Sequence, residues 1–101
     1  MIATTKRVVV PPHVLIRHLD GESVLLNLES ERYFGLDATG TRMWELVTTE
    51  SSTAVAFEKL LNEFEVEPEA LRSHLTELLT GLVENGLLEV QTADVESGST
   101  L

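Results

Sequence analysis

Histidines and carboxylates are the side chains of this sequence that could do chemistry: three His and seventeen Asp plus Glu. His13 and His18 fall in one extended stretch at an odd spacing, which places them on opposite faces of a strand. His74 lies far away in a stretch of helical periodicity. No two histidines have the one-face spacing of a metal site, so the sequence predicts no bound metal.

The carboxylates have structural explanations in the positions that they occupy. Glu29 and Glu31 fall in a predicted turn, Asp37 stands before a predicted helix, and Glu67 and Glu69 stand at the start of another. Anionic side chains stabilise the N-terminal end of a helix because they face its free backbone N–H groups. We therefore expect no general acid–base pair among them.

Other catalytic signals are missing from the sequence. It contains no cysteine, which excludes disulfides, thiolate metal sites and cysteine nucleophiles. The glycine-rich dinucleotide and phosphate-binding motifs and the GxSxG motif of serine hydrolases do not occur. Trp44 is expected in the core rather than at a cofactor site. We predict a protein that is not an enzyme, with no catalytic residues and no cofactor.

The net charge excludes further classes of partner. The formal charge is -10 at pH 7. Nucleic acid and anionic membrane surfaces are polyanionic, and binding them requires clustered cations. No apolar run approaches the ~20 residues that span a bilayer, and the N-terminal stretch lacks the apolar core of a secretory signal. We expect a cytoplasmic protein that binds neither nucleic acid nor membrane.

Apolar periodicity predicts a small α+β domain that resembles a winged helix-turn-helix. Asp20-Gly21 is typical of a tight hairpin turn, Asp37 of a helix N-cap, and Asn85-Gly86 of a helix end. The expected elements are strands at 13–19, 23–27 and 32–36 and helices from 38, at 53–64 and at 68–84. Together they form a three-stranded antiparallel sheet followed by three helices.

The ends of the chain are assigned separately. Residues 1–6 are expected to be a loose arm, and 7–10 a short strand or strap. Residues 87–90 are expected to fold back on the core as an extended piece. The domain then spans 1–90, and 91–101, rich in Ser, Thr, Asp and Gly, is expected to be a disordered acidic and polar tail.

The predicted sheet has one guarded edge and one open edge. Pro11 and Pro12 precede the first strand, and proline cannot donate to a ladder, whereas strand 32–36 contains no proline. An open edge beside an apolar helix can bind an extended peptide. Two alternatives stay open from the residues alone: a winged-helix DNA-binding regulator, and a structural subunit of a modifying enzyme that never contacts the substrate.

The residues around this open edge resemble a known family. The run VLLNLESERYFGLDATGTRMWELV at 24–47, and FEVEPEALRSHLTELLTGLVENGLLEV at 64–90, are similar to PqqD-like proteins, the recognition elements for ribosomally synthesised and post-translationally modified peptides. Residues 11–14 resemble the start of the discrete members found with lasso-peptide biosynthesis. The likeness covers about 10–90. The sequence departs from the family pattern at Glu31, where glycine is frequent, and at Phe34, where Tyr or Trp is common.

The resemblance implies a function and a set of contact residues. Family members bind the leader segment of a precursor peptide and present it to modifying enzymes, here a leader peptidase and a macrolactam-forming cyclase or another modifying enzyme. The leader adds as a strand to the third strand of the sheet and lies against the last helix. Transferred to this chain, the expected peptide-binding residues are Arg32, Tyr33, Phe34, Gly35, Leu36, Leu71, Arg72, Leu75, Thr76 and Leu79.

Overall fold

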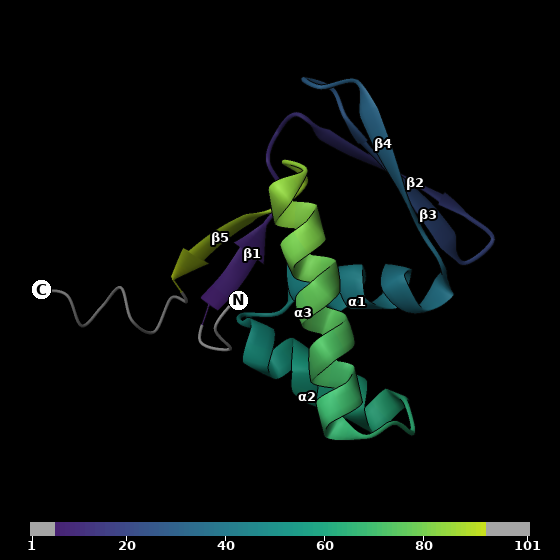
Figure 1. Ribbon diagram of the computed structural model, residues 1–101, viewed down its shortest axis with the longest axis vertical. Coiled ribbons are helices and arrows are strands. Elements are labelled where there is room, and N and C mark those ends of the chain that lie inside the picture. The colour runs from purple at the N-terminus through teal and green to yellow at the C-terminus, as the bar shows by residue number, and fades with distance from the viewer. Residues whose placement is uncertain (1–5, 93–101) are drawn as a thin grey trace, which may run out of the picture.

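The computed structural model describes residues 6–92 and confirms the α+β architecture (Figure 1). Strands β2, β3 and β4 form an antiparallel sheet in the order β2-β3-β4, and three helices follow. The elements are β1 (Lys6–Val9), β2 (Val14–Leu19), β3 (Glu22–Asn27), β4 (Arg32–Leu36), α1 (Ala38–Thr49), α2 (Thr53–Glu63), α3 (Pro68–Glu84) and β5 (Glu89–Thr92).

Local signals set the hairpins of the three-stranded sheet. Asp20 and Gly21 have φ of 52° and 85° in the β2–β3 turn, which is the pair of positive φ values that a two-residue hairpin requires. The register pairs Leu25 of β3 with Ile16 on one side and Phe34 on the other. Leu25 is fully buried, so the central strand anchors the sheet to the core.

The second hairpin turn carries a backbone strain that the sequence alone predicts poorly. Glu31 has φ of 62°, in the left-handed region where a residue with a Cβ costs about 1–2 kcal/mol. We expect the free energy of unfolding of the Glu31→Gly variant to be about 1 kcal/mol higher than that of the Glu31→Ala variant. Both variants remove the carboxylate and only glycine removes the Cβ, so urea denaturation of the pair isolates the strain. Equal stabilities would show that the turn relaxes without cost.

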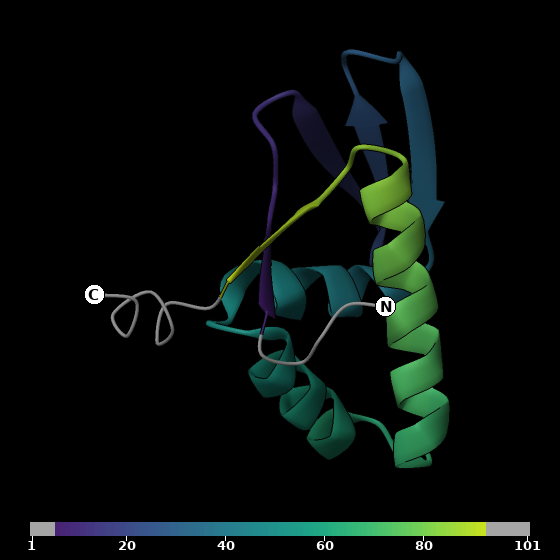
Figure 2. The same ribbon diagram turned by 60° about the vertical axis from the view of Figure 1, so that its left-hand side comes forward.

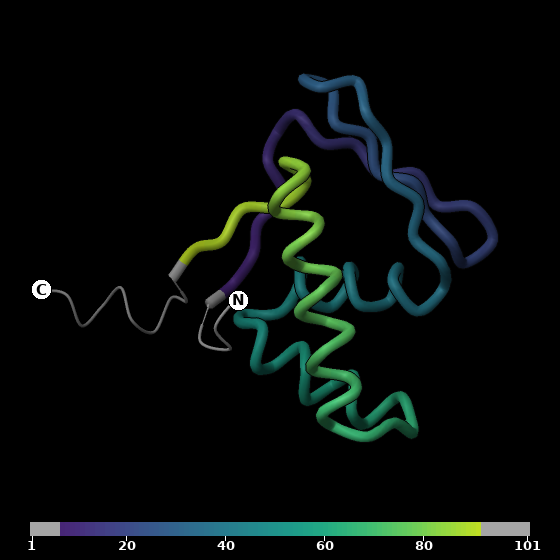
Figure 3. The backbone as a smooth tube through the Cα atoms, in the orientation of Figure 1, coloured from purple at the N-terminus to yellow at the C-terminus, as the bar shows by residue number. Residues whose placement is uncertain are grey.

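The two ends of the domain form a second, smaller sheet. Strands β1 and β5 pair antiparallel, with Val8 opposite Val90, and lie side by side although they come from opposite ends of the chain (Figure 3). Val8 is buried, so the pair covers part of the core. The strap expected at 7–10 is thus a strand, and β5 runs two residues beyond the expected domain end at 90. The arm at 1–5 and the tail at 93–101 lie outside the described residues.

The three helices begin where their capping residues predict. The carboxylate of Asp37 accepts a hydrogen bond from the backbone N–H of Gly40 at 2.8 Å, and Ser52 caps α2 in the same way. Pro68 opens α3 at a position where its missing N–H costs little. The second helix ends at Glu63, one residue before the expected end.

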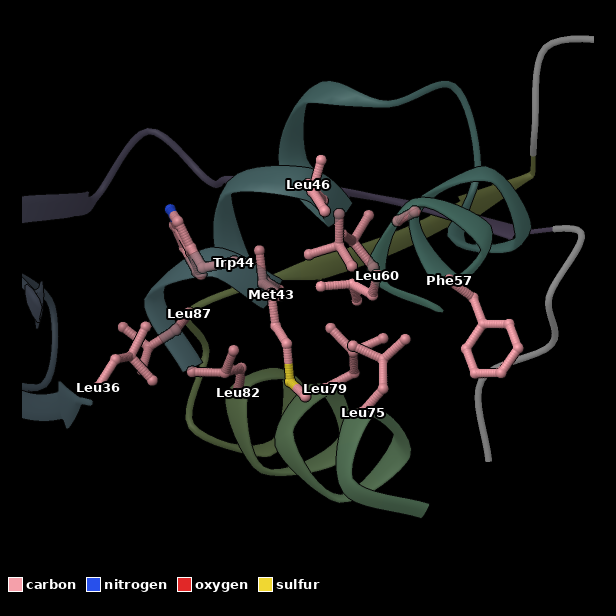
Figure 4. Close-up of a cluster of buried hydrophobic side chains, with 14 of the residues drawn as sticks. Leu36, Met43, Trp44, Leu46, Phe57, Leu60, Leu75, Leu79, Leu82 and Leu87 are labelled. Atoms are coloured by element: carbon pink, nitrogen blue, oxygen red, sulfur yellow. The ribbon is translucent and has the colours of Figure 1, made fainter. Parts of the chain in front are cut away.

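The helices and the sheet share one apolar core (Figure 4). Trp44 is 5% exposed and belongs to this core cluster, as expected. Leu60 and Leu82 are completely buried. On the surface beside this core, Arg42 of α1 donates hydrogen bonds to Glu63 of α2, the shortest at 2.6 Å, and so links the first two helices.

Candidate functional site

The free edge of β4 exposes the backbone groups of two residues. Leu28 donates from its backbone N–H to His13 on the β2 side, whereas the C=O of Asn27 accepts from Glu31 on the β4 side. Because backbone direction alternates along a strand, odd-numbered residues of β3 bond to β4. Their partners in the register are even-numbered, so Tyr33 and Gly35 direct their N–H and C=O groups away from β3. The edge offers two donors and two acceptors to an added strand.

Helix α3 runs alongside this strand. At one end, the side-chain amide of Asn27, which pairs with Arg32 in the register, donates to the C=O of Asn85 at 3.0 Å. At the other end, Asp37, which follows β4 directly, lines a cavity together with Leu78 of α3. The C-terminal part of α3 therefore lies beside β4, as Figure 2 shows.

The turn after α3 is held against the hairpin by a short set of contacts. The Asn27 amide oxygen accepts the backbone N–H groups of Glu29 and Ser30, while its nitrogen donates to Asn85. His13 reaches the C=O of Gly86 through Nε2 at 3.1 Å. These contacts fix the spacing between the β3–β4 turn and the end of α3.

Two cavities open where β4 ends. The first, of about 380 Å³, lies between the start of α1 and the middle of α3; its lining residues are Asp37, Thr39, Gly40, Met43, His74, Glu77 and Leu78. The second, of about 130 Å³, continues toward the α2–α3 connection and is mostly apolar; its lining residues are Thr39, Met43, Phe64, Val66, Ala70, Leu71 and His74. The two share Thr39, Met43 and His74, so they are neighbours, and we call them together the groove.

The expected strand residues divide between the two faces of the sheet. Leu36 is buried in the core, and Phe34 is half-buried and packs against the core. Tyr33 is 78% exposed on the outer face, next to Leu26 and, one strand further, Leu15. Arg32 and Gly35 are exposed. The strand thus presents backbone at its edge and a half-buried Phe34 on the face that packs on the core.

The expected helix residues are either buried in the core or line a different cavity from the groove, with one exception. Leu71, Leu75 and Leu79 are buried in the core, and of these only Leu71 also lines the groove. Arg72 lies over the ring of Phe57 on α2, 4.6 Å from its centroid. Thr76 and Arg72 line a third cavity, which also includes Glu77. Of the helix residues expected from the sequence, only Leu71 lines the groove, and their contact with a leader peptide stays a prediction.

Sequence reasoning missed the residues that do line the groove. These are Thr39 and Met43 of α1 and His74 and Leu78 of α3. Two signals were available. Helix α1 follows β4 after a single residue, which places its first turn at the end of the strand, and His74 and Leu78 are one helical turn apart on the flank beside the leucine stripe.

Among residues 6–92 no group of three His, Asp or Glu side chains could hold a metal ion. Hydrogen bonds from Arg42 hold the pKa of the Glu63 carboxyl below its ordinary value, which is the direction of a structural ion pair rather than of a general acid. None of the described helices is long and apolar enough to cross a membrane.

Comparison with known proteins agrees with this geometry. The family described as coenzyme PQQ synthesis protein D (PqqD) matches residues 22–88. A solved chain described as TbiB1 in complex with the TbiA(beta) leader peptide is 32% identical, with a TM-score of 0.73 over 79% of this chain and 93% of that chain. Lasso peptide synthetase B1, solved with its leader peptide, is 27% identical, with a TM-score of 0.71 over 84% of this chain and 98% of that chain. A comparison with curated proteins found none that matches.

Proposed function

Since the chain belongs to the PqqD family, we propose that it binds the leader segment of a ribosomally synthesised precursor peptide, in a lasso-type pathway, by adding that segment as a strand to β4. The observation that carries the proposal is the free edge of Tyr33 and Gly35 beside α3. The two solved relatives support it, because both were solved with a leader peptide.

Binding would use backbone and apolar contacts together. The edge supplies two donors and two acceptors, each hydrogen bond contributing a net ~0.5–1.5 kcal/mol. Beyond the end of β4, apolar side chains of the leader enter the groove of Met43 and Leu78, at roughly 1.5–3 kcal/mol per fully buried side chain. Ordering a flexible peptide offsets part of this gain. The balance corresponds to dissociation constants from about sub-micromolar to micromolar.

The proposed contact set keeps the strand and shifts the helix contribution. Arg32 through Leu36 contribute through the backbone edge and the Phe34 side chain. On α3, Leu78 and His74 replace most of the residues expected from the sequence, because Leu75 and Leu79 are already packed in the core.

We further propose that the protein is a carrier rather than an enzyme. It would act in the cytoplasm, where precursor peptides are synthesised, and deliver the bound leader to a leader peptidase and a macrolactam-forming cyclase. The DNA-binding alternative has little support, since helix α3 carries only Arg72 and His74 as basic residues and Arg72 packs over Phe57.

Leader binding can be tested directly. A fluorescently labelled leader peptide of a lasso precursor from the same organism is titrated with the purified protein. Fluorescence anisotropy is expected to saturate with a dissociation constant of about 1 μM or below, which corresponds to a binding free energy of about −8 kcal/mol or tighter. A scrambled leader of the same composition is the control. Absence of saturable binding at tens of micromolar contradicts the proposal, and a mobility shift of duplex DNA at low salt would favour the regulator instead.

A further inference from the structure

The groove beyond β4 is lined by acidic as well as apolar side chains. Met43, Phe64 and Leu71 provide apolar walls, but Asp37 and Glu77 stand in the lining of the first cavity. Acidic side chains do not help to bury an apolar group, but they repel a segment that is itself negatively charged. Their presence in the lining therefore selects for the charge of the segment that binds.

Other carboxylates surround the second cavity. Its wall residue Val66 stands between Glu65 and Glu67 in the chain, and its wall residue Ala70 follows Glu69. All three glutamates are exposed, on the connection between α2 and α3 or at the start of α3. The apolar groove therefore opens toward a negatively charged surface.

His74 is the one basic residue among those that line the two cavities. No Lys or Arg is among the residues that line either cavity. Arg42 pairs with Glu63 and Glu45, Lys59 pairs with Glu50, and Arg72 lies over an aromatic ring of α2. Arg42 and Lys59 therefore pair with carboxylates outside the two cavities, whereas Arg72 also lines a neighbouring cavity with Glu69 and Glu77.

We propose that the leader segment filling this groove is cationic: an aliphatic or aromatic side chain enters between Met43 and Leu78, and a neighbouring Lys or Arg of the same peptide pairs with Glu77 and Asp37. This inference rests on the proposed function and adds the class of peptide that the site selects. The groove continues directly from the edge of β4, because Asp37 follows the strand without a gap.

An anionic peptide is the chemical alternative, since the N-terminal end of α1 faces the same cavity. The partial positive charge of a helix N-terminus attracts carboxylates. Here Asp37 already caps that end by accepting the N–H of Gly40 at 2.8 Å. Its full negative charge exceeds the roughly half charge of the helix end, so the cavity favours a cation.

The charge preference is tested with a display library of random short peptides, selected on the purified full chain and eluted by the labelled leader. We expect the selected peptides to carry Lys or Arg beside an aliphatic or aromatic residue. Selection without a charge bias, or with an acidic bias, overturns the inference and leaves leader binding intact. If no peptide is selected and the leader itself does not bind, the proposed function is overturned as well.

A charge reversal then locates the contact. For a selected peptide, Glu77→Lys is expected to weaken binding by about two- to fivefold, which is the range for an exposed ion pair, and the matching Lys→Glu change in the peptide should restore part of the loss. High salt should reduce the difference in peptide affinity between the Glu77→Lys variant and the unmodified protein. The matched control is Glu58→Lys, an exposed residue of α2 that lines neither cavity. An equal effect of both reversals would indicate net charge alone and overturn the assignment to the groove.

Discussion

Replacing Gly86 with alanine is expected to lower the free energy of unfolding by about 2–3 kcal/mol. Gly86 has φ of 73°, where a residue with a Cβ costs about 1–2 kcal/mol. A Cβ at this position would also lie 2.8 Å from the amide nitrogen of Asn27, which holds the end of α3 against the β3–β4 turn. Displacing that amide weakens a hydrogen bond worth roughly 1 kcal/mol. Chemical denaturation monitored by the fluorescence of Trp44 measures the change.

The matched control is the same substitution at Gly81, five residues earlier, inside the helix that precedes Gly86. Gly81 lies inside α3, and a Cβ there meets nothing within 4 Å. Alanine is favoured over glycine by about 0.8–1 kcal/mol within a helix, so Gly81→Ala should raise stability. Opposite signs for the two variants support the geometry. A loss at both positions would show that this end of α3 tolerates no added methyl group, whatever the backbone conformation.

Placing proline at Tyr33 is expected to weaken leader binding by about ten- to a hundredfold while the domain still folds. The backbone N–H of Tyr33 points to the free edge, so proline removes a donor to the added strand and leaves the bonds between β3 and β4 in place. One lost hydrogen bond and the steric obstruction of the neighbouring positions together amount to about 1.5–3 kcal/mol. Anisotropy titration measures the affinity, and circular dichroism verifies the fold.

The opposite edge of the sheet supplies the control. His18 is exposed next to the end of β2, and the alternation set by the bond between Leu28 and His13 directs its N–H away from β3. His18→Pro should therefore have the same effect on the sheet as Tyr33→Pro and none on leader affinity. Tyr33→Thr, which keeps the donor, separates the side chain from the backbone. Unchanged affinity in a folded Tyr33→Pro variant would refute strand addition at β4.

Most of the fold can be read from local sequence signals. Asp20-Gly21, the N-cap Asp37 and Pro68 each fix a turn or a helix start through chemistry within a few residues, and the structure places them as expected. The pairing of β1 with β5 is different, because its partners are about eighty residues apart and the pairing depends on the closed core.

The helix side of the candidate site is harder to predict for a related reason. Leu71, Leu75 and Leu79 share a helical face, but periodicity only says that such a face is apolar, not which flank meets the sheet. That flank is set by how α3 rotates when Asn27 and His13 hold the turn that follows it. The contact of Arg72 with Phe57 is likewise a tertiary outcome.

The open edge of β4 also affects how the protein behaves at high concentration. An unpaired edge next to exposed Leu15 and Tyr33 is also a template for another copy of the same chain, and sheets with such edges tend to aggregate. The sequence contains no proline in β4 to prevent this. The net charge of -10 serves instead, because like-charged molecules repel one another before their edges meet. Salt screens this repulsion, so the protein without a bound peptide should aggregate more readily as ionic strength rises. A peptide bound along β4 covers the edge, and aggregation through that edge should then no longer depend on salt.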